Sequence, residues 1–189
     1  MNILYLDTSQ NLLITGVLKG AENFSRSVDA GKNGHTRILM GEIDAVLSRA
    51  GLAVRDLDAV AAVTGPGSFT GIRIGAATAA ALSRGTGAKK IAVTEFEIIA
   101  YHRERVTAAV EAGRGNLYAA ECEGGRVVAT RFISSEERGG EVFVFEPAAD
   151  RAATLAEIAA EKAEKGMFAT AFEPFYMRKS QAERAQDEV

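Results

Sequence analysis

The residues best suited to chemistry near the N-terminus are a short polar run. Asp7, Thr8 and Ser9 come directly after a continuous apolar run, residues 3–6, which predicts a buried strand. A carboxylate with two hydroxyls at the end of a strand could hold a metal-bound water or a phosphate. The same three side chains could instead satisfy the backbone of their own turn. The sequence leaves both interpretations open.

A second candidate is the glycine-rich run at residues 64–75, which follows the apolar residues 59–63. Its composition predicts a strand, a turn and then the start of a helix. Gly65 and Gly67 allow the turn, and Ser68 is a natural N-cap with free N–H groups beside it. Such a turn can receive an anion or a neighbouring backbone group.

The residues of this run do not match the sequence patterns of two known phosphate-binding loops. A Walker A loop needs Gly-Lys-Ser/Thr after four residues, but counting from Gly65 reaches Thr70 and no lysine follows. The dinucleotide fingerprint would need a glycine where Thr70 stands. We therefore treat the two polar runs as a possible vestigial phosphate or nucleotide site, formed by Asp7, Thr8, Ser9, Gly65, Gly67 and Ser68.

The helix predicted after the turn carries a stripe of small residues. Gly71, Gly75, Ala79 and Ser83 recur at every fourth position and so share one face of the helix. Glycine inside a helix costs about 1 kcal/mol relative to alanine, so two glycines on one face indicate a close approach by another group. That group is either the protein's own sheet or a helix of another subunit.

Another helix is predicted over residues 35–50, with Leu39 and Ile43 on its apolar stripe and Gly51 at its end. His35 opens this helix. A metal site built on the helix would need a second histidine one turn later, where Leu39 stands. His35 is therefore predicted to be a helix-start or interface residue.

Composition narrows the class of protein. The chain has 189 residues, 47% of them hydrophobic, which is enough for a substantial core. Its net charge is −3 and no stretch is rich in Lys and Arg, so we expect RNA to be contacted only through a partner. The single cysteine, Cys122, is predicted to pack in the core. We expect a cytoplasmic location, because there is no secretory signal and no apolar run long enough to span a membrane.

Hydrophobic patterning predicts an α/β protein with mixed sheets, flanking helices and two subdomains. The first, residues 1–103, has expected strands at 3–6, 12–18, 24–28, 59–63 and 91–93. A third helix is expected from its cap, Thr94, to about residue 103. The smaller second subdomain, residues 104–189, has expected strands at 106–110, 117–123, 126–133 and 142–145 and a helix at 154–165. An extended segment, 174–178, and a polar tail, 179–189, complete it.

Several of these motifs together resemble the TsaB (YeaZ) family. They are residues 3–9, His35, the run 65–75, the turn at 111–118 and the segment 174–178. The resemblance implies an actin-like, sugar-kinase/Hsp70-type fold (ASKHA, ribonuclease H-like). It also implies a non-catalytic scaffold subunit of the bacterial machinery that makes threonylcarbamoyladenosine (t6A) at position 37 of tRNA.

The resemblance further implies a set of partners. The chain would bind and activate the catalytic TsaD subunit, act beside the ATPase TsaE, form a homodimer when alone, and meet tRNA only in the complex, without a membrane. TsaD holds its metal on a His-x-x-x-His helix, of which this chain keeps only His35. No cofactor is expected here, with ATP/ADP and a metal ion at the partner subunits. The implied partner interface comprises His35, Leu39, Ile43, Phe69, Thr70, Gly71, Arg73, Gly75 and Ala79.

An alternative function is that of a stand-alone ATP-dependent kinase or carbamoyltransferase of the same fold. Asp7 would then be the acid on the phosphate side. This reading needs a second phosphate loop in the later subdomain, and the turn at 111–115 offers only Glu111, Gly113 and Gly115. We therefore expect an accessory subunit of a tRNA threonylcarbamoyltransferase complex with no catalytic residues of its own.

Overall fold

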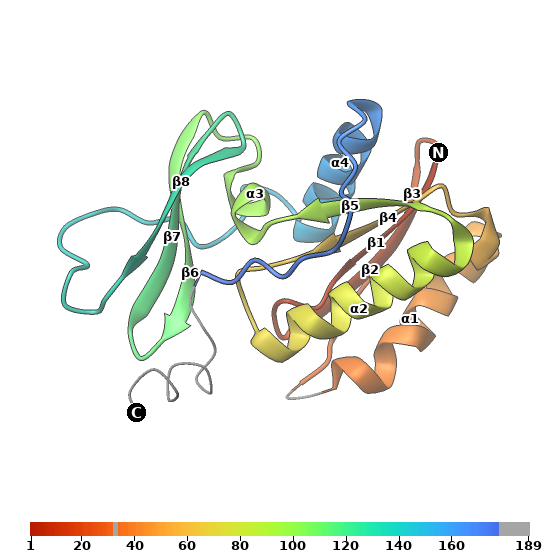
Figure 1. Cartoon of the computed structure of the whole chain (residues 1–189), viewed down its shortest axis with the longest axis horizontal. Helices are drawn as coiled ribbons and strands as arrows, with labels where there is room; N and C mark the ends of the chain where they lie inside the picture. Colours follow the sequence, from red (N-terminus) through yellow and green to blue (C-terminus); the bar gives the residue numbers. More distant parts are fainter. Residues whose placement is uncertain (32–33, 178–189) are drawn as a thin grey trace.

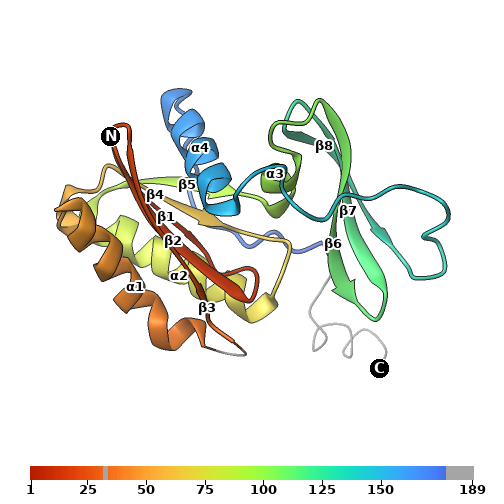
Figure 2. The same cartoon turned by 180° about the vertical axis from the view of Figure 1, so that it is seen from behind.

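The fold is described from a computed structural model, which describes residues 1–31 and 34–177. Within this part of the chain, a five-stranded sheet and a three-stranded sheet stand beside each other, with the short helix α3 (Glu95–Ala100) between them (Figures 1 and 2). The α/β class, the mixed sheet and the flanking helices are confirmed.

The larger sheet has the strand order β3-β2-β1-β4-β5. Its first three strands are an antiparallel meander, and the last two run parallel to β1. The strands are β1 (Asn2–Asp7), β2 (Leu12–Lys19), β3 (Glu22–Asp29), β4 (Ala59–Val63) and β5 (Lys89–Val93). The continuous apolar character of β1 and β4 fits central strands that are covered on both faces.

Helices cover both faces of this sheet. α1 (His35–Ala50) and α2 (Phe69–Thr86) lie on one face, and α4 (Arg151–Glu164) lies on the other (Figures 1 and 2). Successive side chains of a strand point to opposite faces, so β1 serves both layers. Its Leu4 and Leu6 join the cluster under α1 and α2, while Ile3 and Tyr5 join the cluster under α4.

The local signals predicted the bounds of α1 and the cap of α2. α1 spans the predicted residues 35–50 and ends at Gly51, whose φ of 64° places it in the left-handed region that glycine tolerates. The side chain of Ser68 caps α2 by accepting a hydrogen bond from the N–H of Gly71. A short 3-10 helix, η1 (Val54–Asp56), leads into β4.

The smaller sheet is an antiparallel meander of β6 (Arg105–Gly113), β7 (Asn116–Glu123) and β8 (Arg126–Ile133). One of its faces packs against α3 through Phe96, Ile99 and Ala100. Cys122 is buried in the same cluster, as predicted, and burial raises the pKa of its thiol to about 11.

Several expected elements differ from the structure. The helix expected at 154–165 is α4, and it begins at Arg151 after the N-cap Asp150. Residues 142–145 form no strand, because only one parallel bridge joins Val144 to Ala108. α3 ends at Ala100 rather than near residue 103, because the ψ of 138° at Tyr101 and the φ of 60° at His102 are not helical. Residue 178 and the predicted tail, 179–189, lie outside the described residues.

The expected division after residue 103 does not separate the two packing units. α4 follows the smaller sheet in the sequence, yet its apolar face packs on the larger sheet, where Leu155 and Ala159 are fully buried. The chain then returns along β5, where Ala169 pairs with Lys90. The larger unit therefore takes elements from both ends of the chain.

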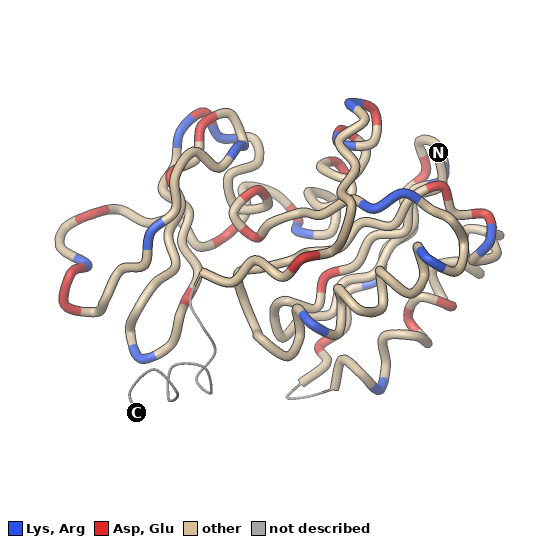
Figure 3. Tube along the Cα trace, viewed as in Figure 1, with Lys and Arg blue, Asp and Glu red and all other residues tan. Residues whose placement is uncertain are grey.

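The charged residues of the described chain form no single-sign face. Acidic and basic residues alternate along the trace of the described chain instead of gathering on one side (Figure 3). None of the helices in residues 1–31 and 34–177 is long and apolar enough to cross a membrane.

Candidate functional site

The two polar runs singled out by sequence meet at one edge of the larger sheet. β1 and β4 are parallel neighbours, with Leu6 opposite Ala62, so the residues after both strands come together. This edge, at the carboxyl ends of parallel strands, is where open α/β sheets hold ligands. The N–H of Ser68 donates to the carbonyl of Ser9 at 2.8 Å, and Gly67 passes so close that a Cβ would lie 2.6 Å from that carbonyl oxygen.

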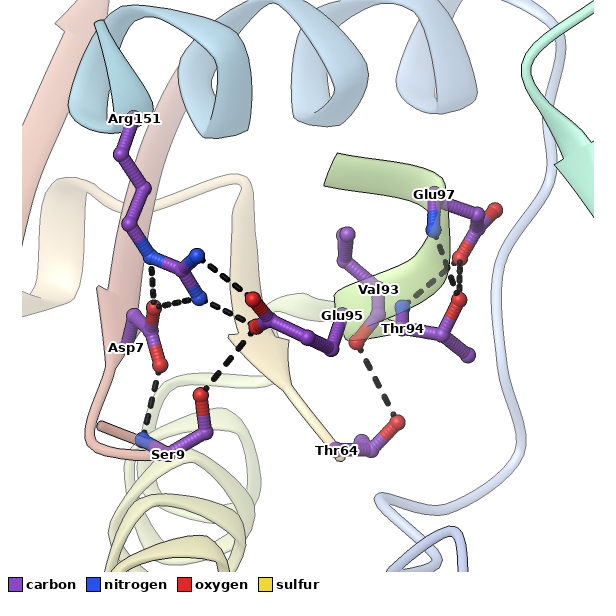
Figure 4. Close-up of polar contacts among 8 residues, drawn as sticks. All are labelled: Asp7, Ser9, Thr64, Val93, Thr94, Glu95, Glu97 and Arg151. Atoms are coloured by element: carbon purple, nitrogen blue, oxygen red, sulfur yellow. Dashed lines mark hydrogen bonds and ion pairs between the residues drawn. The ribbon is translucent and has the colours of Figure 1, made fainter. Parts of the chain in front are cut away.

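An ion cluster lies at the centre of this edge (Figure 4). It is formed by Asp7, Glu95 and Arg151 and is called the Arg151 cluster. The Nε of Arg151 donates to Asp7 Oδ2 at 2.8 Å, and its Nη1 donates to Glu95 Oε1 at 2.6 Å. Its Nη2 contacts both carboxylates, with 2.7 Å to Asp7 Oδ2. Ser9 adds an N–H donated to Asp7 Oδ1 at 2.8 Å. One guanidinium therefore holds two carboxylates from opposite sides of the edge.

Burial sets the electrostatics of this cluster. Asp7 is fully buried and Glu95 is 2% exposed. Burial raises the pKa of the Glu95 carboxyl, and the hydrogen bonds and charge of Arg151 counteract that rise. Burial also opposes the charge of Arg151, but Asp7 and Glu95 outweigh it and raise the pKa of the guanidinium. The two acids thus have their counter-ion within the chain.

The residues of the predicted vestigial site therefore lie together and contact one another. The N–H of Ser68 donates to the carbonyl of Ser9, Asp7 accepts from Arg151, and the Oγ1 of Thr8 donates to the carbonyl of Gly71 at 2.7 Å. A phosphate or nucleotide role for this site stays a prediction. Among the described residues, no three His, Cys, Asp or Glu side chains are grouped as in a metal site.

The small-residue stripe of α2 packs against the end of β1. A Cβ on Gly71 would lie 2.0 Å from the carbonyl oxygen of Thr8, and one on Gly75 would lie 2.3 Å from the Oγ of Thr8. Because real Cβ atoms do not come this close, these positions need glycine for contacts within the chain. The close approach indicated by the stripe is thus made by the protein's own sheet.

This packing bears on the expected partner interface. Six of its nine residues are largely buried within their own chain, namely His35, Leu39, Ile43, Gly71, Gly75 and Ala79. Phe69, Thr70 and Arg73 are exposed, and their role as partner contacts stays a prediction.

An aromatic cluster, the Arg73 cluster, lies on the outer side of α2 and consists of Phe69, Arg73 and Tyr176. The rings of Phe69 and Tyr176 stack with 5.2 Å between their centroids. The guanidinium carbon of Arg73 sits 3.9 Å from the centre of the Phe69 ring, and its Nε donates to the Tyr176 hydroxyl at 2.8 Å. Phe69 and Tyr176 remain 40% and 45% exposed.

Sequence reasoning missed the residues that complete both clusters. Arg151 lies 144 positions from Asp7, and Tyr176 lies 103 positions from Arg73, so no local spacing relates them. Glu95 did carry a local signal as the first residue after the capping Thr94, but that signal describes the helix start and not the ion pair.

The mixed order of the larger sheet, with a glycine turn after β4 and a second antiparallel sheet beyond α3, defines an actin-like fold of the ASKHA, ribonuclease H-like class. The family model described as TsaD, tRNA N6-adenosine threonylcarbamoyltransferase, matches residues 29–138. The chain belongs to this family and, within it, to the TsaB (YeaZ) branch, which confirms the resemblance seen in its motifs.

Three relatives illustrate this placement. TsaB of Haemophilus influenzae, a tRNA threonylcarbamoyladenosine biosynthesis protein, is 31% identical over 62% of this chain and 52% of its own. The tRNA N6-adenosine threonylcarbamoyltransferase of Rhizobium meliloti is 43% identical over 33% of this chain and 18% of its own. The solved structure of YeaZ from Pseudomonas aeruginosa shares the fold, with a TM-score of 0.77 at 22% identity over 93% of this chain and 99% of that one. The chain thus spans about half the length of the TsaB relative.

Proposed function

We propose that this chain is a non-catalytic subunit of the machinery that makes N6-threonylcarbamoyladenosine in tRNA, and that it binds and activates a TsaD-like catalytic subunit. Support comes from its TsaB relatives and from the threonylcarbamoyltransferase model that matches residues 29–138. Since the match covers only 52% of the TsaB relative, activity, substrates and partners are all part of the proposal.

The observation that carries the non-catalytic role is the Arg151 cluster. A kinase or carbamoyltransferase acting alone would need Asp7 free at the strand edge to work on a phosphate or its metal. Here Asp7 is fully buried and held by Arg151, which Glu95 holds from the other side. Incoming phosphate would also meet two carboxylates that already have a counter-ion, so the charge balance does not favour it.

The surface that we propose for the catalytic subunit is the Arg73 cluster with the neighbouring Thr70. Arginine and tyrosine are enriched among the residues that dominate binding energy at protein interfaces, and stacked aromatic rings add a rigid apolar area. The cluster is partly exposed and is held in place by its own stacking and hydrogen bond. It can therefore meet a partner without first being ordered.

The rest of the proposal concerns the assembly. The chain would form a homodimer when alone. In the complex, the TsaD-like subunit would replace the second copy of the chain. The complex would act beside a TsaE-like ATPase in the cytoplasm. ATP or ADP and a metal ion would bind at those subunits, and tRNA would be contacted only through the complex. The interspersed charges of the described chain fit this indirect role (Figure 3).

Reconstitution tests the proposed function. Purified TsaD-like and TsaE-like subunits of the same organism are given threonylcarbamoyl-adenylate, ATP and unmodified tRNA, with and without this chain, and modified adenosine is measured by mass spectrometry. We expect modification only when the chain is present, and no modification by the chain alone. Full activity without the chain, or ATP turnover by the chain alone, would contradict the proposal.

A further inference from the structure

The outer edge of β6 is only partly covered by the rest of the chain. After β8 the chain swings out in a long loop and then returns beside this edge, where Val144 forms a single parallel bridge (Figures 1 and 2). The N–H of Val144 donates to the carbonyl of Thr107 at 2.9 Å, and its carbonyl accepts from the N–H of Ala109 at 2.8 Å. The next bonds of a parallel ladder, from Val142 to Arg105 and from Thr107 to Val142, are not made between these described residues. The edge is therefore open on one side of the bridge.

The larger sheet shows which element belongs at such an edge. There, the antiparallel meander of β1, β2 and β3 is followed by β4, which pairs in parallel with β1 along residues 59–62. The smaller sheet repeats this order, because the meander of β6, β7 and β8 is followed by the parallel bridge of Val144 to β6. Residues 141–146, called the strap, therefore lie at the place of a fourth strand without forming it.

The side chains of the strap alternate as in a strand. Val144 joins the apolar cluster that α3 covers, whereas Phe143 joins the cluster on the opposite face of the sheet. Val142 would come next on the α3 side, but it is 81% exposed. It borders a pocket of about 500 Å³ whose apolar lining includes Val106, Cys122 and Val144. Moving Val142 into this pocket would remove an apolar side chain from water, which is favourable.

An ion pair joins the start of the strap to the far edge of the smaller sheet. Glu141, the first residue of the strap, is paired with Arg131 of β8. In a fourth strand beside β6, Glu141 would lie three strand spacings of about 4.8 Å each from β8, and farther along the sheet as well, so this pair would break. The two side chains are 44% and 38% exposed, and ion pairs this exposed are weak. The open position of the strap therefore depends on a weak contact.

We propose that the strap is a switch. When the pair of Arg131 and Glu141 is broken, the strap closes as a fourth strand parallel to β6, with Val142 in the pocket. Closing completes the ladder at Thr107 and Arg105 and covers an edge that in the open form is free to pair with another extended chain. A carboxylate of a partner that takes Arg131 from Glu141 would favour the closed form.

Glu141→Gln tests the switch, because it removes the charge of the pair and keeps the shape of the side chain. Hydrogen exchange of the full chain is followed by NMR and expressed as protection factors, which correct for the local sequence. We expect the protection of the Val142 and Thr107 amides to rise about tenfold or more over the native chain. Glu136→Gln is the matched control, since Glu136 is an exposed acid of the same loop outside the pair.

A second variant and a salt series separate closing from a general change in the loop. Glu141→Gln combined with Val142→Asp places a charge where the apolar pocket would receive valine, so the added protection should be lost. Sodium chloride at about 1 M screens an exposed pair, so it should raise the protection of Val142 in the native chain but not in Glu141→Gln. The inference is overturned if Val142 is equally unprotected in the native chain, Glu136→Gln and Glu141→Gln, or if the native chain already protects it at low salt.

Discussion

The two sides of α2 show how one sequence run can encode both packing and surface. On the inner side, Gly71 and Gly75 leave no room for a Cβ against Thr8. On the outer side, Phe69 and Arg73, each two residues from Gly71, are exposed and contact each other. The small-residue stripe therefore reflects the close packing of α2 against its own chain. The large side chains of Phe69 and Arg73 form the candidate contact surface.

The Arg151 cluster belongs to the inner side of this comparison, and its loss should have the largest effect. Arg151→Met removes the one cation between two buried carboxylates, and breaking such a pair costs about 3–5 kcal/mol. Urea denaturation at neutral pH measures this loss. Arg84→Met, at an exposed position on α2, should stay within about 0.5 kcal/mol of the native chain. Equal stabilities of the two variants would show that the cluster is dispensable.

The pH dependence of Arg151→Met should identify the cause. Burial raises the pKa of Glu95 in the folded state, and without Arg151 only the hydrogen bond from Ser9 counteracts that rise. The folded variant would then keep a proton that the unfolded chain releases, so its stability falls as the pH rises above the ordinary pKa of glutamate. Lowering the pH from neutral toward that value should reduce the difference in unfolding free energy between the variant and the native protein. A difference in unfolding free energy that does not change with pH would point to lost packing instead of lost charge compensation.

Glycine-to-alanine changes sharpen the comparison within α2 itself. Gly75→Ala places a Cβ 2.3 Å from the Thr8 Oγ and should destabilise the fold by about 1–3 kcal/mol through overpacking. Gly85→Ala, on the same helix, meets nothing within 4 Å and should stabilise it by up to about 1 kcal/mol. Thermal melting compares them. If Gly75→Ala melts like the native chain, the inner side of α2 is looser than described.

The outer side of α2 should show the smallest effect on folding and the largest on pairing. Arg73→Ala removes a cation–π contact worth about 0.5–1 kcal/mol and one exposed hydrogen bond, so the melting temperature should change little. Affinity for the TsaD-like subunit, measured by calorimetry, should fall markedly. Arg84→Ala serves as the matched control, since it removes the same charge from the same helix. Equal affinities of the two variants would place the interface elsewhere.

Local signals in the sequence determined most of the elements of this protein. The bounds of α1 and β4 were predicted to the residue, and the caps at Ser68 and Thr94 were found where their side chains suggested. Helix and strand starts depend on neighbours within a few positions, and such neighbours can be read directly. Asp7 and the glycine turn were also grouped in one possible site, although nothing in their local sequence relates the two.

Only the tertiary structure decided what Asp7 contacts and which side of α2 is open. Arg151 reaches Asp7 across 144 positions because α4 returns to the larger sheet after the smaller one is complete. The sequence showed that something must approach Gly71 and Gly75, but the partner, Thr8, follows from how β1 and α2 pack. Contacts between distant segments depend on the path of the whole chain, and no periodicity or spacing in the sequence contains that path.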